Sequence, residues 1–491
     1  MSEFLVNKIG GTSAGSPENI VGLANNPEGT FIPEDHEGPA RLALVVSAVG
    51  GVEGDERRVT GMARDYARSV ASGDPDFELR DAIIHRHETV YDNLEESRLG
   101  PIINDLAGDL LPDDRKTEAD YVSLGEEYSA RLLAEAIDGE YVRPDHIAFK
   151  NGEYNLPATV DKLRVAQAVG ELDSDRPLVY AGYFGFDRFG ERHLLDSGGS
   201  DRTAAALAIA LSSGFYGKWS DIEGIHTANP KEVEGTKIRP RMTFAEIREY
   251  ALGGNPVLNG RTPVDLDQFG WDGTLVLRST FNPSEPGTEI TNARLSDNAE
   301  PVAAIASRDV DMISISDFGM AHAVGYVSRA TKHAEDLGLS ISHFPAGNDA
   351  LTFIIDPDKD DDKTNGNGAS YGEKLEALER HLQDEAVSPN ASVRVEQDRA
   401  LLVMVGESLR LKEVRTLTNA RFNLALLRGG VAVRDALGNI QSPSLIYEID
   451  RAETARAQAL AHSEFISDPV LEGILKIPTA ELKKYKSSNV I

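Results

Sequence analysis

The stretch Phe4-Leu-Val-Asn-Lys-Ile-Gly-Gly-Thr-Ser13 is an apolar, strand-like run that ends in a Gly-Gly turn. A second glycine turn, Ser197-Gly-Gly-Ser-Asp201, opens an alanine-rich, helix-like segment. Glycine lets backbone N–H groups approach a phosphate chain closely, and a helix N-terminus adds donors and partial positive charge. Because one turn carries a lysine and the other an aspartate, the pair predicts phosphoryl transfer.

Composition limits the classes of protein that remain. The 491 residues are enough for two or three domains, and the chain has no cysteine, which excludes disulfides, thiolate metal sites and cysteine nucleophiles. No apolar stretch reaches the roughly 20 residues of a membrane span, and the first residues do not resemble a signal peptide. We therefore expect a cytoplasmic protein with no membrane partner. The net charge of −30 argues against a nucleic-acid partner.

The hydrophobic pattern divides the chain near residue 300. Up to about residue 295, β-branched runs such as 42–46 alternate with helical patterns such as 126–137. This alternation predicts an α/β domain with a mainly parallel sheet and helices on both faces. Beyond it, the order strand, helix, strand occurs twice, at 310–355 and 401–447, which predicts two small regulatory modules. The acidic run 356–363 lacks the glycine and closing glutamate of a calcium loop, so we predict no metal site there.

Six segments, in this order, resemble the aspartate kinases of the amino-acid-kinase superfamily that carry C-terminal tandem ACT domains. They are Val6–Ser13, Val45–Gly51, Ser123–Leu133, Gly198–Ala204, Trp219–Ile225 and Asn282–Thr288. The resemblance runs over nearly the whole chain. It implies an αβα sandwich of the amino-acid-kinase fold over residues 1–298, followed by a ferredoxin-like tandem ACT regulatory region over residues 299–491.

The resemblance also implies the reaction: ATP, with Mg²⁺, phosphorylates the side-chain carboxylate of L-aspartate on the route to lysine, threonine and methionine. A carboxylate is already a nucleophile, so the protein must supply mainly positioning and charge neutralisation. Lys8 and Asp201 are the expected catalytic residues, with Asp201 orienting Lys8 or binding the substrate amine. The implied substrate contacts are Ser47, Glu53, Glu126, Ser197 and Ser200, and the implied ATP contacts are Gly10, Gly11, Thr12, Ser13, Gly198, Gly199, Trp219, Asp221 and Lys231.

Simpler roles remain open for several of these residues. An acidic residue such as Glu126 in a first helical turn also favours a helix N-terminus without any ligand. Ser47 and Ser200 have the composition of local caps, and Trp219 that of a packing residue. In isolation, Gly10-Gly11 also has the composition of a tight turn, and Lys8 that of a solvated charge at a strand end.

Several positions depart from the family pattern where the family contacts its ligands. Ser197 stands where the family has an arginine, and Glu53 stands where it has a threonine. Both changes work against binding a dicarboxylate, since a guanidinium grips a carboxylate through two hydrogen bonds. Pro256 stands in place of a lysine that the family uses near ATP. The nearby candidates to replace the lost arginine are Arg188, Arg192 and Arg202.

These departures leave three functions open: an aspartate kinase, a kinase of the same fold acting on another amino acid or small carboxylate, and a non-catalytic amino-acid sensor. In the ACT-like region, Ser342 and residues 346–348 replace groups with which the family grips an effector. An amino-acid effector is an expected partner, but we expect lysine inhibition to be weak or absent. The modules equally suit a dimer contact, and we expect a homodimer or a higher homo-oligomer.

Overall fold

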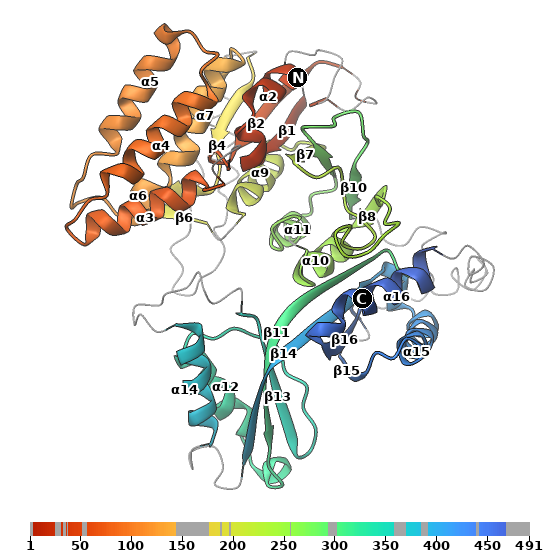
Figure 1. Ribbon diagram of the computed structural model, residues 1–491. Coiled ribbons are helices and arrows are strands. Elements are labelled where there is room, and N and C mark those ends of the chain that lie inside the picture. The colour runs from red at the N-terminus through yellow and green to blue at the C-terminus, as the bar shows by residue number, and fades with distance from the viewer. Residues whose placement is uncertain are drawn as a thin grey trace. The chain divides into compact units, whose positions relative to one another are not determined.

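The computed structural model shown in Figure 1 describes residues 3–24, 31–32, 36, 38–51, 56–143, 176–186, 189–195, 198–255, 257–292, 302–357, 370–383, 391–437 and 441–467. The chain forms two compact units. The first comprises Met1–Ile225, Ile238–Arg248 and Pro256–Arg294, and the second comprises His226–Lys237, Glu249–Asn255 and Leu295–Ile491.

The first unit is built on an eight-stranded sheet with the order β3-β4-β2-β1-β7-β9-β10-β8. All neighbours in it run parallel except β9 and β10. Its strands are β1 (Glu3–Ile9), β2 (Ala40–Val46), β3 (Glu140–Val142), β4 (Leu178–Ala181), β7 (Phe215–Ser220), β8 (Arg241–Thr243), β9 (Thr274–Ser279) and β10 (Thr288–Thr291). The mainly parallel sheet predicted from the sequence is confirmed, and β1 and β7 lie at its centre.

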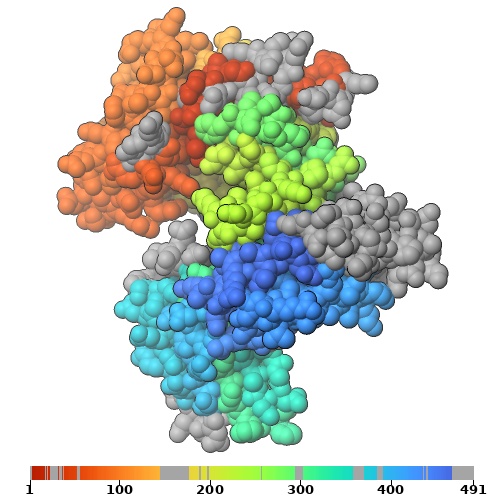
Figure 2. Space-filling view, turned by 45° about the vertical axis from the view of Figure 1, so that its right-hand side comes forward, coloured from red at the N-terminus to blue at the C-terminus, as the bar shows by residue number. Residues whose placement is uncertain are grey.

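Helices cover both faces of this sheet. Successive residues of a strand face opposite sides, and Ile9 of β1 packs with α3 to α7 whereas Lys8 reaches α9. Helices α3, α4 and α5 form one continuous surface, drawn in orange in Figure 2. The helices are α1 (Gly11–Ala14), α2 (Pro17–Ala24), α3 (Val59–Ala71), α4 (Phe77–Val90), α5 (Glu96–Asp109), α6 (Glu118–Val122), α7 (Leu124–Ala136), α9 (Gly199–Ala210), α10 (Phe244–Leu252) and α11 (Thr262–Gln268), with a hairpin of β5 (Phe184–Phe186) and β6 (Arg192–Leu194).

The second unit contains a six-stranded antiparallel sheet with the order β12-β13-β11-β14-β16-β15. The two predicted modules share this sheet through the long central pair β11 and β14. Its elements are β11 (Ala304–Ser316), α12 (Tyr326–Asp336), β12 (Ile341–His343), β13 (Ala350–Ile355), α14 (Tyr371–Gln383), β14 (Ser392–Val405), α15 (Lys412–Arg428), β15 (Val433–Leu437), β16 (Ser444–Asp450) and α16 (Thr454–His462), with the short turns η2 (Met320–His322), η3 (Glu407–Arg410), η4 (Arg451–Glu453) and η5 (Ser463–Ser467).

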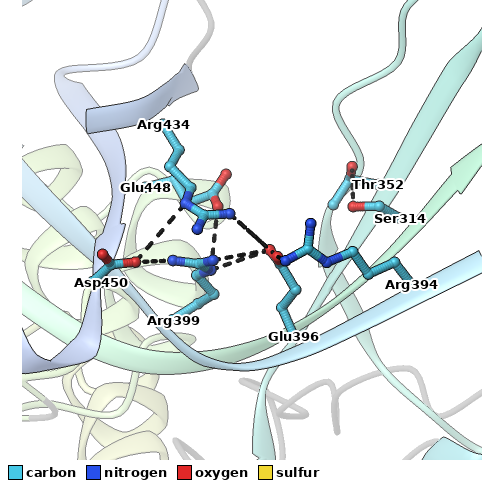
Figure 3. A network of polar contacts seen from close by, with 8 residues as sticks. All are labelled: Ser314, Thr352, Arg394, Glu396, Arg399, Arg434, Glu448 and Asp450. Carbon is cyan, nitrogen blue, oxygen red and sulfur yellow. Dashed lines mark hydrogen bonds and ion pairs between the residues drawn. The ribbon is translucent and has the colours of Figure 1, made fainter. Parts of the chain in front are cut away.

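A β-bulge marks the middle of the shared strands. The register of β11 and β14 shifts where Val310 faces Arg399 and Met312 faces Glu396. Residues three apart on a regular strand face opposite sides, but here Arg399 and Glu396 meet at 3.2 Å. Figure 3 shows the Arg399 guanidinium between Glu396 and Asp450. The bulge therefore places a buried arginine among carboxylates and fixes the register where the modules meet.

Candidate active site

Two lysines converge on one aspartate at the carboxyl end of the parallel sheet. Lys8 of β1 and Lys218 of β7 lie opposite each other in the strand register. The Nζ of Lys8 is 3.0 Å from Oδ1 of Asp201, and the Nζ of Lys218 is 2.7 Å from Oδ2. Asp201 belongs to the first turn of α9, and its Oδ2 also accepts the backbone N–H of Asn259 at 3.1 Å. All three side chains are buried.

The electrostatics of this cluster suit an anion. Burial works to raise the pKa of Asp201, but Lys218 and Lys8 outweigh it and the pKa falls to about 2. Burial lowers the pKa of Lys218 to about 8, although Asp201 opposes the change. The contact between Lys8 and Oδ1 has the distance of an ion pair without hydrogen-bond geometry. Two ammonium groups thus share one carboxylate, and the surplus positive charge favours a phosphate group.

The glycine turns are required by close packing. A Cβ on Gly50 would lie 2.8 Å from the carbonyl carbon of Gly11. The turn at Gly50, which follows β2, therefore touches the Gly10-Gly11 turn, which follows β1, through the backbone. Gly198 has a φ of 76°, in the left-handed region that favours glycine. A Cβ on Gly199 would lie 2.4 Å from the Cβ of Leu195. The N–H of Gly10 donates to the carbonyl of Trp219, so this particular donor serves the sheet.

A buried carboxyl group lies at the start of α7. Glu126 interacts with the side chain of Thr60 and with the backbone N–H of Ala48. Burial raises its pKa to about 8 in spite of these contacts, and its Oε2 has no hydrogen-bond partner among the described residues. A buried carboxyl oxygen without a partner is unfavourable unless a donor arrives. The group is therefore suited to a ligand that carries an ammonium.

Other expected contacts lie around the same edge. Ser200 is buried against Gly182, whose Cβ would lie 2.6 Å from that of the serine, and the N–H of Ser47 donates to the carbonyl of Ile9. Ser13 shares a 2.8 Å hydrogen bond with Thr280, and Thr12 is exposed beside it. These side chains cluster at the ends of β1, β2 and α9, where the two glycine turns also lie.

The remaining expected contacts are placed differently. Trp219 is fully buried, donates to Oδ1 of Asn7 at 2.8 Å and packs edge-on against Phe31, so its indole has a packing role. Asp221 is exposed just after β7, and Lys231 is exposed in a segment of the second unit. The expected substrate contacts Glu53 and Ser197 lie outside the described residues, as do Arg188 and Pro256.

Sequence reasoning missed Lys218 and Thr60. Lys218 sits inside an aromatic strand, and only the register of β7 against β1 brings it beside Lys8. Thr60 is the second residue of α3, and its hydroxyl beside the apolar Val59 was its only signal. Within the described part of the chain, no group of three or more His, Cys, Asp or Glu side chains forms a metal site, and no helix combines the length and apolar character needed to cross a bilayer.

Comparison with known proteins identifies the family of the chain. The model of the Amino acid kinase family matches residues 3–260, and the chain belongs to this family. It is therefore a kinase. Aspartokinase 3 of Bacillus subtilis is 26% identical over 448 residues, which cover 87% of this chain and 93% of that protein.

Two solved structures share the fold. Aspartate kinase from Clostridium acetobutylicum aligns with a TM-score of 0.72 at 18% identity, covering 95% of this chain and all of that one. Aspartokinase III of E. coli, solved in complex with lysine and aspartate, aligns with a TM-score of 0.71 at 20% identity, again over 95% of this chain and 100% of that chain. The α/β amino-acid-kinase fold is thus confirmed, and the structural likeness extends over nearly the full length.

Proposed function

We propose that this chain transfers the γ-phosphoryl group of MgATP to the side-chain carboxylate of L-aspartate, giving 4-phospho-L-aspartate. The observation that carries the proposal is the buried Lys8–Asp201–Lys218 cluster at the carboxyl end of the parallel sheet. The Bacillus subtilis relative, named an aspartokinase, supports the choice of aspartate. Glu126 adds a buried carboxyl suited to the ammonium group of an amino acid.

The chemistry requires little covalent help from the protein. An oxygen of the aspartate side chain attacks the γ-phosphorus, the bond to the bridging oxygen breaks, and ADP leaves with the electron pair. Lys8 and Lys218 neutralise the charge on the transferred group, while Asp201 holds the two ammonium groups apart and in place. Mg²⁺ enters with ATP as part of the substrate, since protein-bound Mg²⁺ is held largely by phosphate oxygens and water.

Binding of the substrate ammonium would stabilise the charged form of Glu126. Burial raises the pKa of this group because it disfavours the charged form. An ammonium beside it favours ionisation and lowers the pKa again. Ser47 and Ser200 supply hydroxyl groups at the same edge for the substrate carboxylates or the phosphate. The glycine turns at Gly11 and Gly198 bring backbone close to the nucleotide.

We assign the chemistry to residues 1–298 and regulation to residues 299–491. The antiparallel sheet with its flanking helices supports an ACT-type regulatory role for the second region, with an amino acid as its effector. A homodimer or higher homo-oligomer in the cytoplasm, acting in amino-acid biosynthesis, completes the proposal.

Hydroxylamine traps acyl phosphates as hydroxamates, so a hydroxamate assay with MgATP reads the reaction directly. We expect aspartate-dependent signal in the wild-type protein and its loss in Lys8→Ala. A panel of other amino acids and dicarboxylates should give little product. Signal with another acid and none with aspartate would overturn the choice of substrate, and silence across the panel would overturn the kinase proposal.

A further inference from the structure

An aspartate substrate presents two carboxylates and one ammonium. The Lys8–Lys218 pair serves the carboxylate that is phosphorylated, and Glu126 serves the ammonium. The α-carboxylate sits on the same carbon as the ammonium, so the cation that binds it must lie close to Glu126. A guanidinium is the best geometric match to a carboxylate.

The arginines first expected in this role are engaged elsewhere or not described. Arg202 forms a buried ion pair with Asp265 at 2.8 Å, its side chain only 5% exposed. Arg192 lies 2.8 Å from Glu127 and donates to the hydroxyl of Ser123 at 2.7 Å. Arg188 lies outside the described residues. Helix α3, which reaches Glu126 through Thr60, carries a further candidate cation.

Helix α3 presents an arginine toward Glu126. Arg64 follows Thr60 by four residues, so the two side chains lie on one face of α3. Thr60 contacts Glu126 directly. Arg64 therefore lies one turn beyond the residue that contacts Glu126, and its charge is among the groups that oppose the burial-driven rise in the pKa of that carboxyl group.

A tyrosine connects the same arginine to the start of α9. The Nη2 of Arg64 donates to the hydroxyl of Tyr183 at 3.1 Å. Tyr183 is buried with a left-handed φ of 75°, a conformation that is uncommon for non-glycine residues and recurs at functional sites. Its ring packs on α9, because a Cβ on Gly199 would lie 3.0 Å from the ring. Arg64 is thus tied to the element that carries Ser200 and Asp201.

We propose that Arg64 binds the α-carboxylate of the substrate and so sets the preference for aspartate, an inference that rests on the proposed kinase activity. Glu126 and Arg64 then hold the two polar groups of one carbon atom, and the side-chain carboxylate extends toward Lys8 and Lys218. The ion pair of Arg64 with Glu118 does not oppose this role, since Glu118 is 47% exposed and exposed pairs contribute little.

The test compares L-aspartate with its α-amide, which keeps the ammonium and the reactive carboxylate but lacks the α-carboxylate. We expect Arg64→Gln to lower kcat/KM for aspartate roughly 10- to 100-fold, mainly through KM, and to leave the value for the α-amide nearly unchanged. Arg68→Gln is the matched control, because Arg68 lies one turn further along α3 with its side chain 59% exposed. Tyr183→Phe should raise KM for aspartate several-fold with the same selectivity.

The outcomes separate this assignment from the proposed function. Equal losses with aspartate and its α-amide in Arg64→Gln would show a structural role and overturn the assignment alone. Unchanged kinetics in Arg64→Gln would overturn it as well. A wild-type protein without aspartate-dependent hydroxamate would overturn the proposed function, and the assignment with it.

Discussion

Lys8 and Lys218 occupy opposite positions in the register of β1 and β7, and their ammonium groups face the two oxygens of a single carboxylate, Asp201. Parallel pairing of the two central strands thus turns two residues more than 200 positions apart in sequence into one cationic site. The arrangement predicts that both lysines are needed, although only one was expected from the sequence.

Replacing Lys218 with methionine keeps the length of the side chain and removes its charge. We expect kcat in the hydroxamate assay to fall by roughly 100-fold or more, as for other groups that stabilise transition-state charge. Lys332→Met is the control, because the side chain of Lys332 is 58% exposed and lies on α12 of the second unit. A Lys218→Met protein that keeps more than half of the wild-type kcat would refute a catalytic role for this lysine.

The lowered pKa of Lys218, about 8, predicts an alkaline limit to activity. As the pH rises through this value the ammonium loses its proton, so kcat/KM for ATP should fall. Arginine stays charged throughout this range. Lys218→Arg, if it retains activity, should therefore move the limit to higher pH. An alkaline limit at the same pH in both proteins would assign it to another group.

Glu126 is expected to lower the stability of the folded protein at alkaline pH, although it is needed for activity. Its pKa is about 8 in the folded protein and near the ordinary glutamate value of 4.5 in the unfolded chain. The unfolded chain releases its proton first as the pH rises, so this group makes folding progressively less favourable between those values. Glu126→Gln should raise the free energy of unfolding at pH 9 by a few kcal/mol, leave it nearly unchanged at pH 4.5, and abolish aspartate phosphorylation. Urea denaturation at the two pH values checks this, and equal effects at both would contradict it.

Alanine substitutions at two glycines are expected to change the stability of the protein in opposite directions. Gly50→Ala forces a Cβ within 3 Å of the backbone of Gly11, so it should destabilise the fold and weaken ATP binding. Gly61→Ala lies in α3 with nothing within 4 Å of the added Cβ, and should stabilise by about 0.5–1 kcal/mol. Thermal unfolding with and without ATP measures both. A Gly50→Ala protein as stable as Gly61→Ala would show that the close contact between the backbones of Gly50 and Gly11 is not required.

Lysine should inhibit this protein weakly or not at all. Ser342 stands at a position expected to grip an effector, but its hydroxyl donates to the carbonyl of Ile354 at 3.1 Å. That contact ties the side chain to the neighbouring strand instead of a ligand. Initial rates with and without millimolar lysine test the prediction, and clear inhibition at physiological concentrations would contradict it.

The sequence predicted the features that depend on local pattern. Alternating apolar strands and helices gave the parallel sheet, and the two glycine turns gave Lys8 and Asp201, which the fold brings within 3.0 Å. Residues that act through tertiary register were missed. In the sequence pattern, Lys218 is one polar residue inside a strand. Arg64 belongs to the polar face of an amphipathic helix, which the pattern assigns to solvent.

The antiparallel sheet of the second unit was likewise predicted only in part. The pattern predicted two modules but not that they share one sheet, because strand pairing across about 90 residues leaves no local signal. The ion pair of Glu396 with Arg399 depends on a bulge, and a regular strand would put these residues on opposite faces.

The core of the second unit contains Ala228 and Val233, from a segment inside the family-matched part of the chain. Thr227 of the same segment pairs with His462 near the far end of the second unit, at 3.0 Å. A gene divided at codon 298 would therefore encode a downstream half with two side chains missing from its core. If residues 299–491 of this chain were moved to another protein, the core would be complete only if the 226–237 segment moved with them.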